Sequence, residues 1–147
     1  MASLKDILAD HPFLKGIHPD YIASIAECAV IKNFEAGQYI LREKEEANEF
    51  YLILHGKVAL GTFISGRGFT TIQTLGQGEI VGWSWLVPPY RWRFDALVIL
   101  PTQAIAVDAK GLRERCEADH NFGYVMAKQM AGVIGERLTA TRMRLEV

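Results

Sequence analysis

Residues 50–64 read Phe-Tyr-Leu-Ile-Leu-His-Gly-Lys-Val-Ala-Leu-Gly-Thr-Phe-Ile and carry a clear β-strand signal. Aromatic and β-branched residues are typical of strands, and a glycine between two such runs is typical of a tight turn. The stretch therefore predicts two strands, residues 50–54 and 58–64, that form a hairpin around His55-Gly56-Lys57.

Further short strand-like runs follow this stretch along the chain. Residues 70–75 end at Gly76-Gln-Gly78, and residues 97–100 and 103–107 are separated by Pro101. Many short strands with a turn signal roughly every 8 to 12 residues are typical of an antiparallel sandwich or roll. We therefore expect a mainly β fold, a jelly-roll-like antiparallel β-roll over residues 34–108, and no parallel dinucleotide-binding sheet.

Helical patterns flank the predicted roll. Residues 1–32 read as helical, because Pro19 suits a first helical position and apolar residues follow it at helical spacing. After the roll, a short helix over residues 112–118 precedes a long helix that starts at an Asn121 cap and runs toward Val147. We expect one domain over residues 1–147, with N-terminal helices over 1–33 and C-terminal helices over 109–147.

The long helix carries a continuous apolar stripe. About 27 residues of helix are roughly 40 Å long, more than a small β domain can cover. Gly132 and Gly135 are costly inside a helix and indicate the close approach of another backbone. We expect part of the stripe to pack on the roll and the rest to form a homodimer. The stripe consists of Phe122, Val125, Met126, Met130, Val133, Ile134, Leu138 and Leu145.

The composition excludes several classes of protein. The 147 residues are 50% hydrophobic and 22% charged, with a net charge of -1, so a normal core is expected and a broad nucleic-acid surface is not. No signal peptide and no run of 18 apolar residues occurs, which predicts a cytoplasmic protein without a membrane segment. Cys28 and Cys116 belong to no CxxC pair, and we expect reduced thiols.

Motifs for catalysis are missing from the sequence. There is no HxH with a downstream glutamate, as a cupin-type metal enzyme would need, and no GxSxG or GxxxxGK[ST] motif. We predict neither an enzyme, nor a metal site, nor a covalent cofactor. The scattered histidines are expected to be surface or turn residues; they are His11, His18, His55 and His120.

Residues 75–96 read Leu-Gly-Gln-Gly-Glu-Ile-Val-Gly-Trp-Ser-Trp-Leu-Val-Pro-Pro-Tyr-Arg-Trp-Arg-Phe-Asp-Ala and hold every tryptophan of the chain. The glycines would let backbone N–H groups face an anion, and Arg91 or Arg93 could pair with a phosphate or carboxylate. The alternative is an apolar plug, in which the aromatic rings fill one end of the roll. The residue types alone leave both interpretations open.

Three motifs together resemble the cyclic nucleotide-binding domain of the catabolite activator (Crp/Fnr) superfamily. They are Phe34-x-x-Gly37-Gln38-x-Ile40, Phe50-Tyr-Leu-Ile-x-x-Gly56-x-Val58-x-Leu60 and Leu75-Gly-x-Gly78-Glu-Ile-x-Gly82. His11-Pro-Phe-Leu is similar to the family's N-terminal entry, and residues 129–147 are similar to its long dimerisation helix. The resemblance covers nearly the whole chain and implies a β-roll in which a phosphate-binding cassette holds a cyclic nucleotide.

The cassette departs from the family pattern. Gly82 matches, but Val81 replaces a phenylalanine, and Trp83 replaces the glutamate that accepts from the ribose 2′-hydroxyl. Tryptophan is a donor only, and an unpartnered buried hydroxyl costs about 1–3 kcal/mol. Affinity for cyclic AMP is therefore expected to fall by roughly 5- to 150-fold.

The arginine of the family's cassette aligns to Trp92, between Arg91 and Arg93, and Arg91 is the preferred candidate. The segment also resembles a divergent bacterial subgroup with Gly-Trp-Ser-Trp-Leu and Pro-Pro-Tyr-Arg-Trp. On the long helix, Thr141 aligns with a threonine that contacts the base. The predicted ligand-binding residues are Gly82, Trp83, Ser84, Trp85, Leu86, Arg91, Arg93 and Thr141.

We therefore predict a signal-transduction module that binds cyclic AMP, cyclic GMP or another anionic small molecule in the roll and signals through its C-terminal helices. The alternative from a different class is a ligand-free structural or protein-interaction domain with an aromatic-plugged pocket. No helix-turn-helix follows the long helix, so direct DNA binding is not expected.

Overall fold

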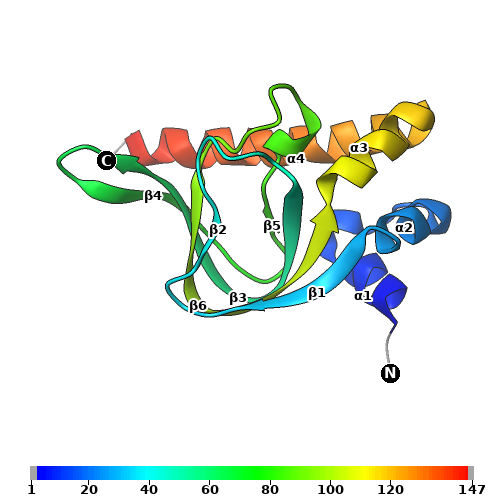
Figure 1. The fold of residues 1–147 in the computed structure, drawn as a ribbon, viewed down its shortest axis with the longest axis horizontal. Helices are drawn as coiled ribbons and strands as arrows, with labels where there is room; N and C mark the ends of the chain where they lie inside the picture. The colour runs from blue at the N-terminus through cyan, green and yellow to red at the C-terminus, as the bar shows by residue number, and fades with distance from the viewer. Residues whose placement is uncertain (1–2, 146–147) are drawn as a thin grey trace.

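The computed structural model describes residues 3–145, and a rolled β-sheet forms the centre of the molecule (Figure 1). Its main path runs β1-β6-β3-β4, while β2 pairs with β6 and β5 pairs with β3, and every pairing is antiparallel. The expected mainly β fold, an antiparallel β-roll with flanking helices, is confirmed. The strands are β1 (Ala29–Phe34), β2 (Tyr39–Leu41), β3 (Glu49–Ile64), β4 (Gly68–Leu75), β5 (Ile80–Val81) and β6 (Asp95–Asp108).

The two long strands β3 and β6 pair along most of their length and bend together. The register of β3 shifts repeatedly between Ile53 and Val58, which is the signature of a bulged strand. Gly56 has φ +123°, and a Cβ there would lie 2.6 Å from the Cα of Thr102 on β6. The predicted hairpin at residues 55–57 is therefore wrong: the glycine serves close packing at a bulge, and β3 continues through it.

The chain reverses ten residues later, between β3 and β4. The Arg67 N–H donates to the Ile64 carbonyl at 2.9 Å, and Gly66 has φ +84°. This turn makes a hairpin of the second half of β3 and β4. The hairpin therefore lies about ten residues later in the chain than predicted.

Pro101 lies inside β6 instead of separating two strands. It falls between the residue pairs Leu100–Lys57 and Gln103–His55, opposite the bulge of β3. A residue without an N–H is tolerated at a bulge because no ladder hydrogen bond is lost there. The predicted break between residues 100 and 103 is thus a bend in one strand.

The N-terminal helices are shorter than expected. They are α1 (Leu4–Asp10), the 3-10 helix η1 (Pro12–Leu14) and α2 (Pro19–Ala26). Ser3 caps α1 in a capping box with Asp6, and Pro19 is the first residue of α2 as predicted. Helix was expected to residue 32, but β1 begins at Ala29 because its Ala-Val-Ile run pairs with β6.

The C-terminal helices are α3 (Ala109–Ala118) and α4 (His120–Leu145), and α4 lies across the roll (Figure 1). Asp119, one residue after α3, starts α4: its Oδ1 accepts from the N–H groups of Asn121 and Phe122 at 3.1 and 3.2 Å. Asn121 is therefore not the cap. The predicted end at Val147 lies outside the described residues. No helix within residues 3–145 is long and apolar enough to cross a membrane.

The apolar stripe of α4 divides into two faces. Phe122, Met126, Met130 and Val133 are buried in the core. Ile134, Leu138 and Leu145 are exposed, together with Tyr124. A Cβ at Gly132 or Gly135 would meet no atom within 4 Å, so these glycines serve no close approach within this chain.

Candidate functional site

The segment between β4 and β6, residues 76–94, is called the cassette segment below. It folds as β5, a glycine turn, the 3-10 helix η2 (Ser84–Leu86) and an extended loop. Gly82 forms the turn with φ +101°, a conformation that favours glycine. A Cβ at this position would lie 2.6 Å from a ring carbon of Trp92. Gly82 is therefore required both for its backbone conformation and for the packing of the Trp92 ring.

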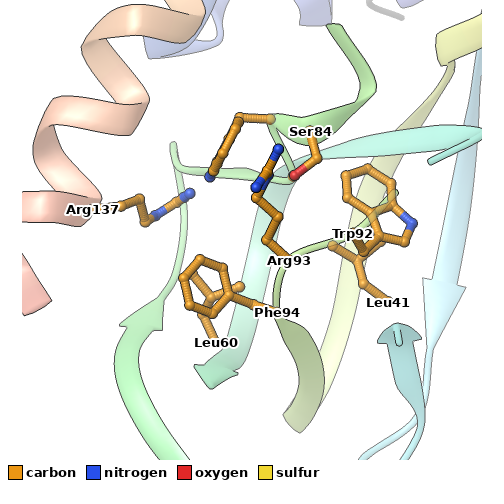
Figure 2. Close-up of a pocket in the computed structure, with 9 residues that line it drawn as sticks. Leu41, Leu60, Ser84, Trp92, Arg93, Phe94 and Arg137 are labelled. Atoms are coloured by element: carbon orange, nitrogen blue, oxygen red, sulfur yellow. The ribbon is translucent and has the colours of Figure 1, made fainter. Parts of the chain in front are cut away.

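A narrow cavity, with about 10 Å³ of space for the centre of a water-sized molecule, lies between this segment, the sheet and α4 (Figure 2). Two cations line it: Arg93 comes from the loop before β6, and Arg137 reaches in from α4. Ser84 supplies a hydroxyl, and among the residues that the structure describes no carboxylate lines the cavity. The remaining lining residues are Leu41, Leu60, Gly82, Trp83, Trp92 and Phe94.

The structure brings four of the predicted site residues together: Gly82, Trp83, Ser84 and Arg93. Ser84 is buried, whereas Arg93 is exposed at the rim. The Arg93 guanidinium carbon lies 5.4 Å from the centroid of the Trp83 ring, within cation–π range. The tryptophan that replaces the family's glutamate thus contacts the arginine of the same site.

Arg91, the preferred arginine, does not line the cavity. Its Nη1 donates to the Lys44 carbonyl at 3.0 Å, and its backbone forms a β-bridge with Glu46. Arg91 therefore ties the loop before β6 to the loop after β2. The geometry favours Arg93 over Arg91 as the arginine of the cavity.

Trp85 and Leu86 do not line the cavity although they follow Ser84 directly. Trp85 is fully buried and stacks on Phe50 with ring centroids 4.5 Å apart and an interplanar angle of 7°. Leu86 lines a different surface depression next to Tyr90 and α3. Trp85 anchors the cassette segment in the core, as the plug interpretation expects for one of its rings.

Thr141 also lies away from the cavity lining. Its hydroxyl donates to the Arg137 carbonyl, one helical turn earlier, at 2.8 Å. Such a bond is typical of threonine inside a helix. Within one chain, the structure shows no contact of Thr141 with the cassette segment.

Arg137 is a cavity residue that the sequence reasoning missed. Its side chain is only 6% exposed, and burial lowers its pKa. Nη2 donates to the Ile80 carbonyl, whereas Nε and Nη1 have no hydrogen-bond partner among the described residues. Arg137 follows Val133 by four residues and so continues the buried face of α4. A charged residue at a position where the helical pattern expects an apolar one was the signal that could have identified it.

Two glutamates share a second depression with Arg137. Glu79 and Glu136 line a second depression together with Arg137 and residues of η1. Burial and the charge of Glu136 raise the pKa of Glu79, and Arg137 partly opposes that rise. Arg137 thus lines both this depression and the cavity.

Arg113 connects α3 to the cassette segment. Its Nη1 donates to the Trp85 carbonyl at 2.7 Å and to the Ala47 carbonyl at 3.2 Å. The guanidinium carbon also lies 4.4 Å from the centroid of the Tyr90 ring. A displacement of η2 would therefore move α3 through these bonds.

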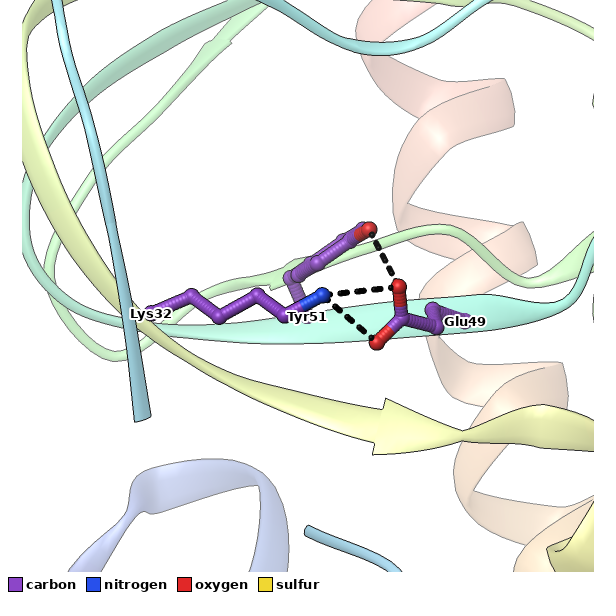
Figure 3. Close-up of polar contacts among 3 residues, drawn as sticks. All are labelled: Lys32, Glu49 and Tyr51. Atoms are coloured by element: carbon purple, nitrogen blue, oxygen red, sulfur yellow. Dashed lines mark hydrogen bonds and ion pairs between the residues drawn. The ribbon is translucent and has the colours of Figure 1, made fainter. Parts of the chain in front are cut away.

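A polar cluster on β1 and β3 lies apart from the cavity (Figure 3). The carboxylate of Glu49 accepts from Lys32 Nζ at 3.1 Å through both oxygens and from the Tyr51 hydroxyl at 3.4 Å. Burial and the Glu49 charge raise the pKa of Tyr51. The cluster joins side chains of the two strands and contributes nothing to the cavity.

The histidines and cysteines do not line the cavity. His11 lies at the turn between α1 and η1, one of the two expected positions, but it is buried. Its Nδ1 accepts from the Phe13 N–H, and Nε2 bonds the Ile53 carbonyl. Cys28 and Cys116 are free thiols. No group of three or more His, Cys, Asp or Glu within residues 3–145 could hold a metal ion.

The comparison with protein families agrees with this geometry. Residues 31–119, which include the sheet, the cassette segment and α3, match the cyclic nucleotide-binding domain. The chain belongs to this family. This match confirms the resemblance to the cyclic nucleotide-binding superfamily.

Curated relatives of this cyclic nucleotide-binding domain are larger proteins. The CRP-like cAMP-activated global transcriptional regulator of Mycobacterium tuberculosis is 24% identical over 131 residues, which are 86% of this chain and 58% of that protein. Human cGMP-dependent protein kinase 2 is 30% identical over 79 residues, 53% of this chain and 10% of the kinase. The chain thus spans only part of the length of these relatives.

A solved structure supports the fold assignment. A putative cyclic nucleotide-binding protein from Geobacter metallireducens superposes with a TM-score of 0.83 at 25% identity, covering 94% of this chain and 99% of that chain. The Crp/Fnr-like β-roll with a long C-terminal helix is therefore established for this protein.

Proposed function

We propose that the protein is a regulatory module that binds an anionic small molecule in the cavity and signals through α3 and α4. Cyclic AMP and cyclic GMP are the first candidates because one relative is named as cAMP-activated and another as cGMP-dependent. The observation that carries the proposal is the position of Arg137. Because this residue of α4 lines the same cavity as Arg93 of the cassette segment, an anion bound there would contact the roll and the helix together.

Coupling requires that the ligand binds two arrangements of the helices with different affinity. Arg137 can contact a ligand only where α4 holds it against the cavity. Arg113 ties α3 to η2, so the second C-terminal helix also follows the cassette segment. These two arginines give a bound anion two routes to the C-terminal helices.

We also propose that the module is a cytoplasmic homodimer through the exposed face of α4. Tyr124, Ile134, Leu138 and Leu145 recur at spacings of 10, 4 and 7 residues, which keeps them on one side of the helix. The exposed glycines Gly132 and Gly135 would let a second backbone approach. The Gly-Trp-Ser-Trp-Leu cassette places the chain, in this proposal, in a divergent bacterial subgroup.

Isothermal titration with cyclic AMP and cyclic GMP tests the nucleotide part of the proposal. Trp83 offers no acceptor to the ribose hydroxyl, so we expect affinity well below that of a cassette with glutamate. Heat of binding that disappears in Arg93→Ala would support the site. A nucleotide that binds equally well to wild type and Arg93→Ala would place binding elsewhere.

A ligand-free interaction domain is the second candidate, favoured by the buried rings of Trp85 and Trp92. Arg93→Ala separates the two functions because Arg93 is exposed at the rim. In a ligand site this variant loses anion binding and keeps its melting temperature. In an aromatic plug the same change mainly lowers the melting temperature, because the contact with Trp83 is lost.

A further inference from the structure

We propose that the cavity selects a compact oxyanion, a small carboxylate or phosphate, over a cyclic nucleotide. This inference rests on the proposed anion-sensing function and specifies the class of its ligand. Three properties of the cavity carry it: an unpartnered buried guanidinium, a lining that offers donors, and its small volume.

The guanidinium of Arg137 is the strongest of these observations. Ninety-four per cent of the residue is removed from solvent, as its 6% exposure implies, yet two of its three nitrogens have no partner among the described residues. Arginine stays charged in proteins, and a buried charge without partners is costly. An oxyanion in the cavity that Arg137 lines would supply the missing acceptors through charge-assisted hydrogen bonds.

The remaining polar groups match an anion as well. Arg93 adds a second positive charge, Trp83 is a donor only, and Ser84 contributes a hydroxyl. The acidic residues Glu79 and Glu136 line a neighbouring depression and act on the Arg137 charge, but neither lines the cavity or accepts a hydrogen bond from the two unpartnered nitrogens. The lining therefore offers a ligand two cations and few acceptors, which suits an oxyanion and leaves ribose hydroxyls without carboxylate partners.

The volume argues against a nucleotide. Pockets for drug-sized ligands begin at roughly 300 Å³, whereas this cavity leaves only about 10 Å³ for the centre of a water-sized molecule. The Trp92 ring packs against Gly82, and Leu41, Leu60 and Phe94 form apolar walls. The remaining space has no room for a ribose and a base, so the smallest oxyanions require the least displacement of these walls.

The test compares wild type, Arg137→Met and Arg93→Gln, with Lys128→Met as a matched control on the exposed surface of α4. Each protein is titrated with inorganic phosphate, succinate, cyclic AMP and cyclic GMP, by calorimetry and by thermal shift. We expect phosphate or succinate at millimolar concentration to raise the melting temperature of wild type and Lys128→Met. Binding should weaken at least tenfold in Arg137→Met and Arg93→Gln. The phosphate and succinate arms distinguish a phosphate ligand from a carboxylate.

The other outcomes separate the two proposals. A cyclic nucleotide that binds more tightly than both compact anions overturns the inferred ligand class and supports the proposed function. Compact-anion binding that survives in both arginine variants overturns the inferred site. If none of the four probes binds wild type, the inference and the anion-sensing function both fail. Arg93→Gln at the exposed rim keeps the test valid if Arg137→Met does not fold.

Discussion

Arg137 places a charge where the pattern of α4 would otherwise have an apolar side chain. Met126, Met130 and Val133 precede it on the buried face of the helix. One hydrogen bond, to the Ile80 carbonyl, holds the guanidinium without satisfying its other nitrogens. A residue of this kind costs stability in the free protein, and in our proposal a bound anion supplies the missing partners.

Replacement of Arg137 by methionine should therefore stabilise the ligand-free protein. A side chain of similar length without charge removes the cost of an unsatisfied buried group, about 1–3 kcal/mol. Urea denaturation in a buffer without phosphate or carboxylate measures the change in the free energy of unfolding. A loss of stability would show instead that the bond to Ile80 is mainly structural.

Gly82→Ala should lower the free energy of unfolding more than the same replacement at another glycine that has a positive φ. The new Cβ would meet the Trp92 ring, and overpacking typically costs about 1–3 kcal/mol in addition to the backbone strain. Gly66→Ala is the matched control, because its φ is +84° and a Cβ there would meet no atom within 4 Å. Equal losses in denaturation experiments would contradict the role given to Trp92.

His11 should make stability depend on pH. Burial lowers the pKa of His11 below its ordinary value of 6.5, so the unfolded chain takes up a proton at a higher pH than the folded chain. The contribution of neutral His11 is complete above pH 6.5 and is lost as the pH falls through the folded pKa. The advantage of wild type over His11→Gln should shrink between pH 7 and 5.5 in thermal denaturation, and a constant difference would refute this.

At the scale of elements, the errors in strand prediction share one cause. Gly56 and Pro101 are turn signals in the local sequence, yet in the structure they lie at one bend of two paired strands. Turns and bulges use the same residues. Both include positions with an unusual backbone conformation, which glycine adopts, and positions without a ladder hydrogen bond, which proline tolerates. Only the long-range contact between Gly56 and Thr102 decides between them.

The site was predictable where local sequence determines geometry. Gly82, Trp83 and Ser84 are consecutive residues at a turn, and the glycine predicted that turn. Arg91 and Arg93 are two residues apart, and the pairing of the Arg91 backbone with Glu46 determines which one reaches the cavity. Neither that pairing nor the approach of α4 can be derived from local patterns.

The exposed face of α4 is the element on which the proposed dimer depends. Leu138 is 69% exposed, and Leu138→Glu should convert a dimer to a monomer because a charge would be buried at the interface. Phe63→Glu, also at a residue 69% exposed but on β3, is the matched control and should leave the mass unchanged. Light scattering after size exclusion measures both, and a dimeric Leu138→Glu would exclude this interface.

At the scale of the whole molecule, the roll and the C-terminal helices meet at one cavity. Arg93 belongs to the loop before β6 and Arg137 to α4, and the space between them joins the two parts of the fold. Arg113 holds the cassette segment to α3 from the outside. A ligand in this cavity would therefore change the contacts between the roll and both C-terminal helices.

The most direct test of this account is a titration followed by NMR of the arginine side-chain Nε–H groups. Signals are assigned through Arg137→Met, Arg93→Gln and Arg91→Lys, and the added probes are succinate, phosphate and cyclic AMP. The account predicts saturable shifts of the Arg93 and Arg137 signals with a compact anion, while Arg91 stays unchanged. The account would be contradicted if none of the three probes shifted the Arg137 signal at concentrations that shift the other arginine signals.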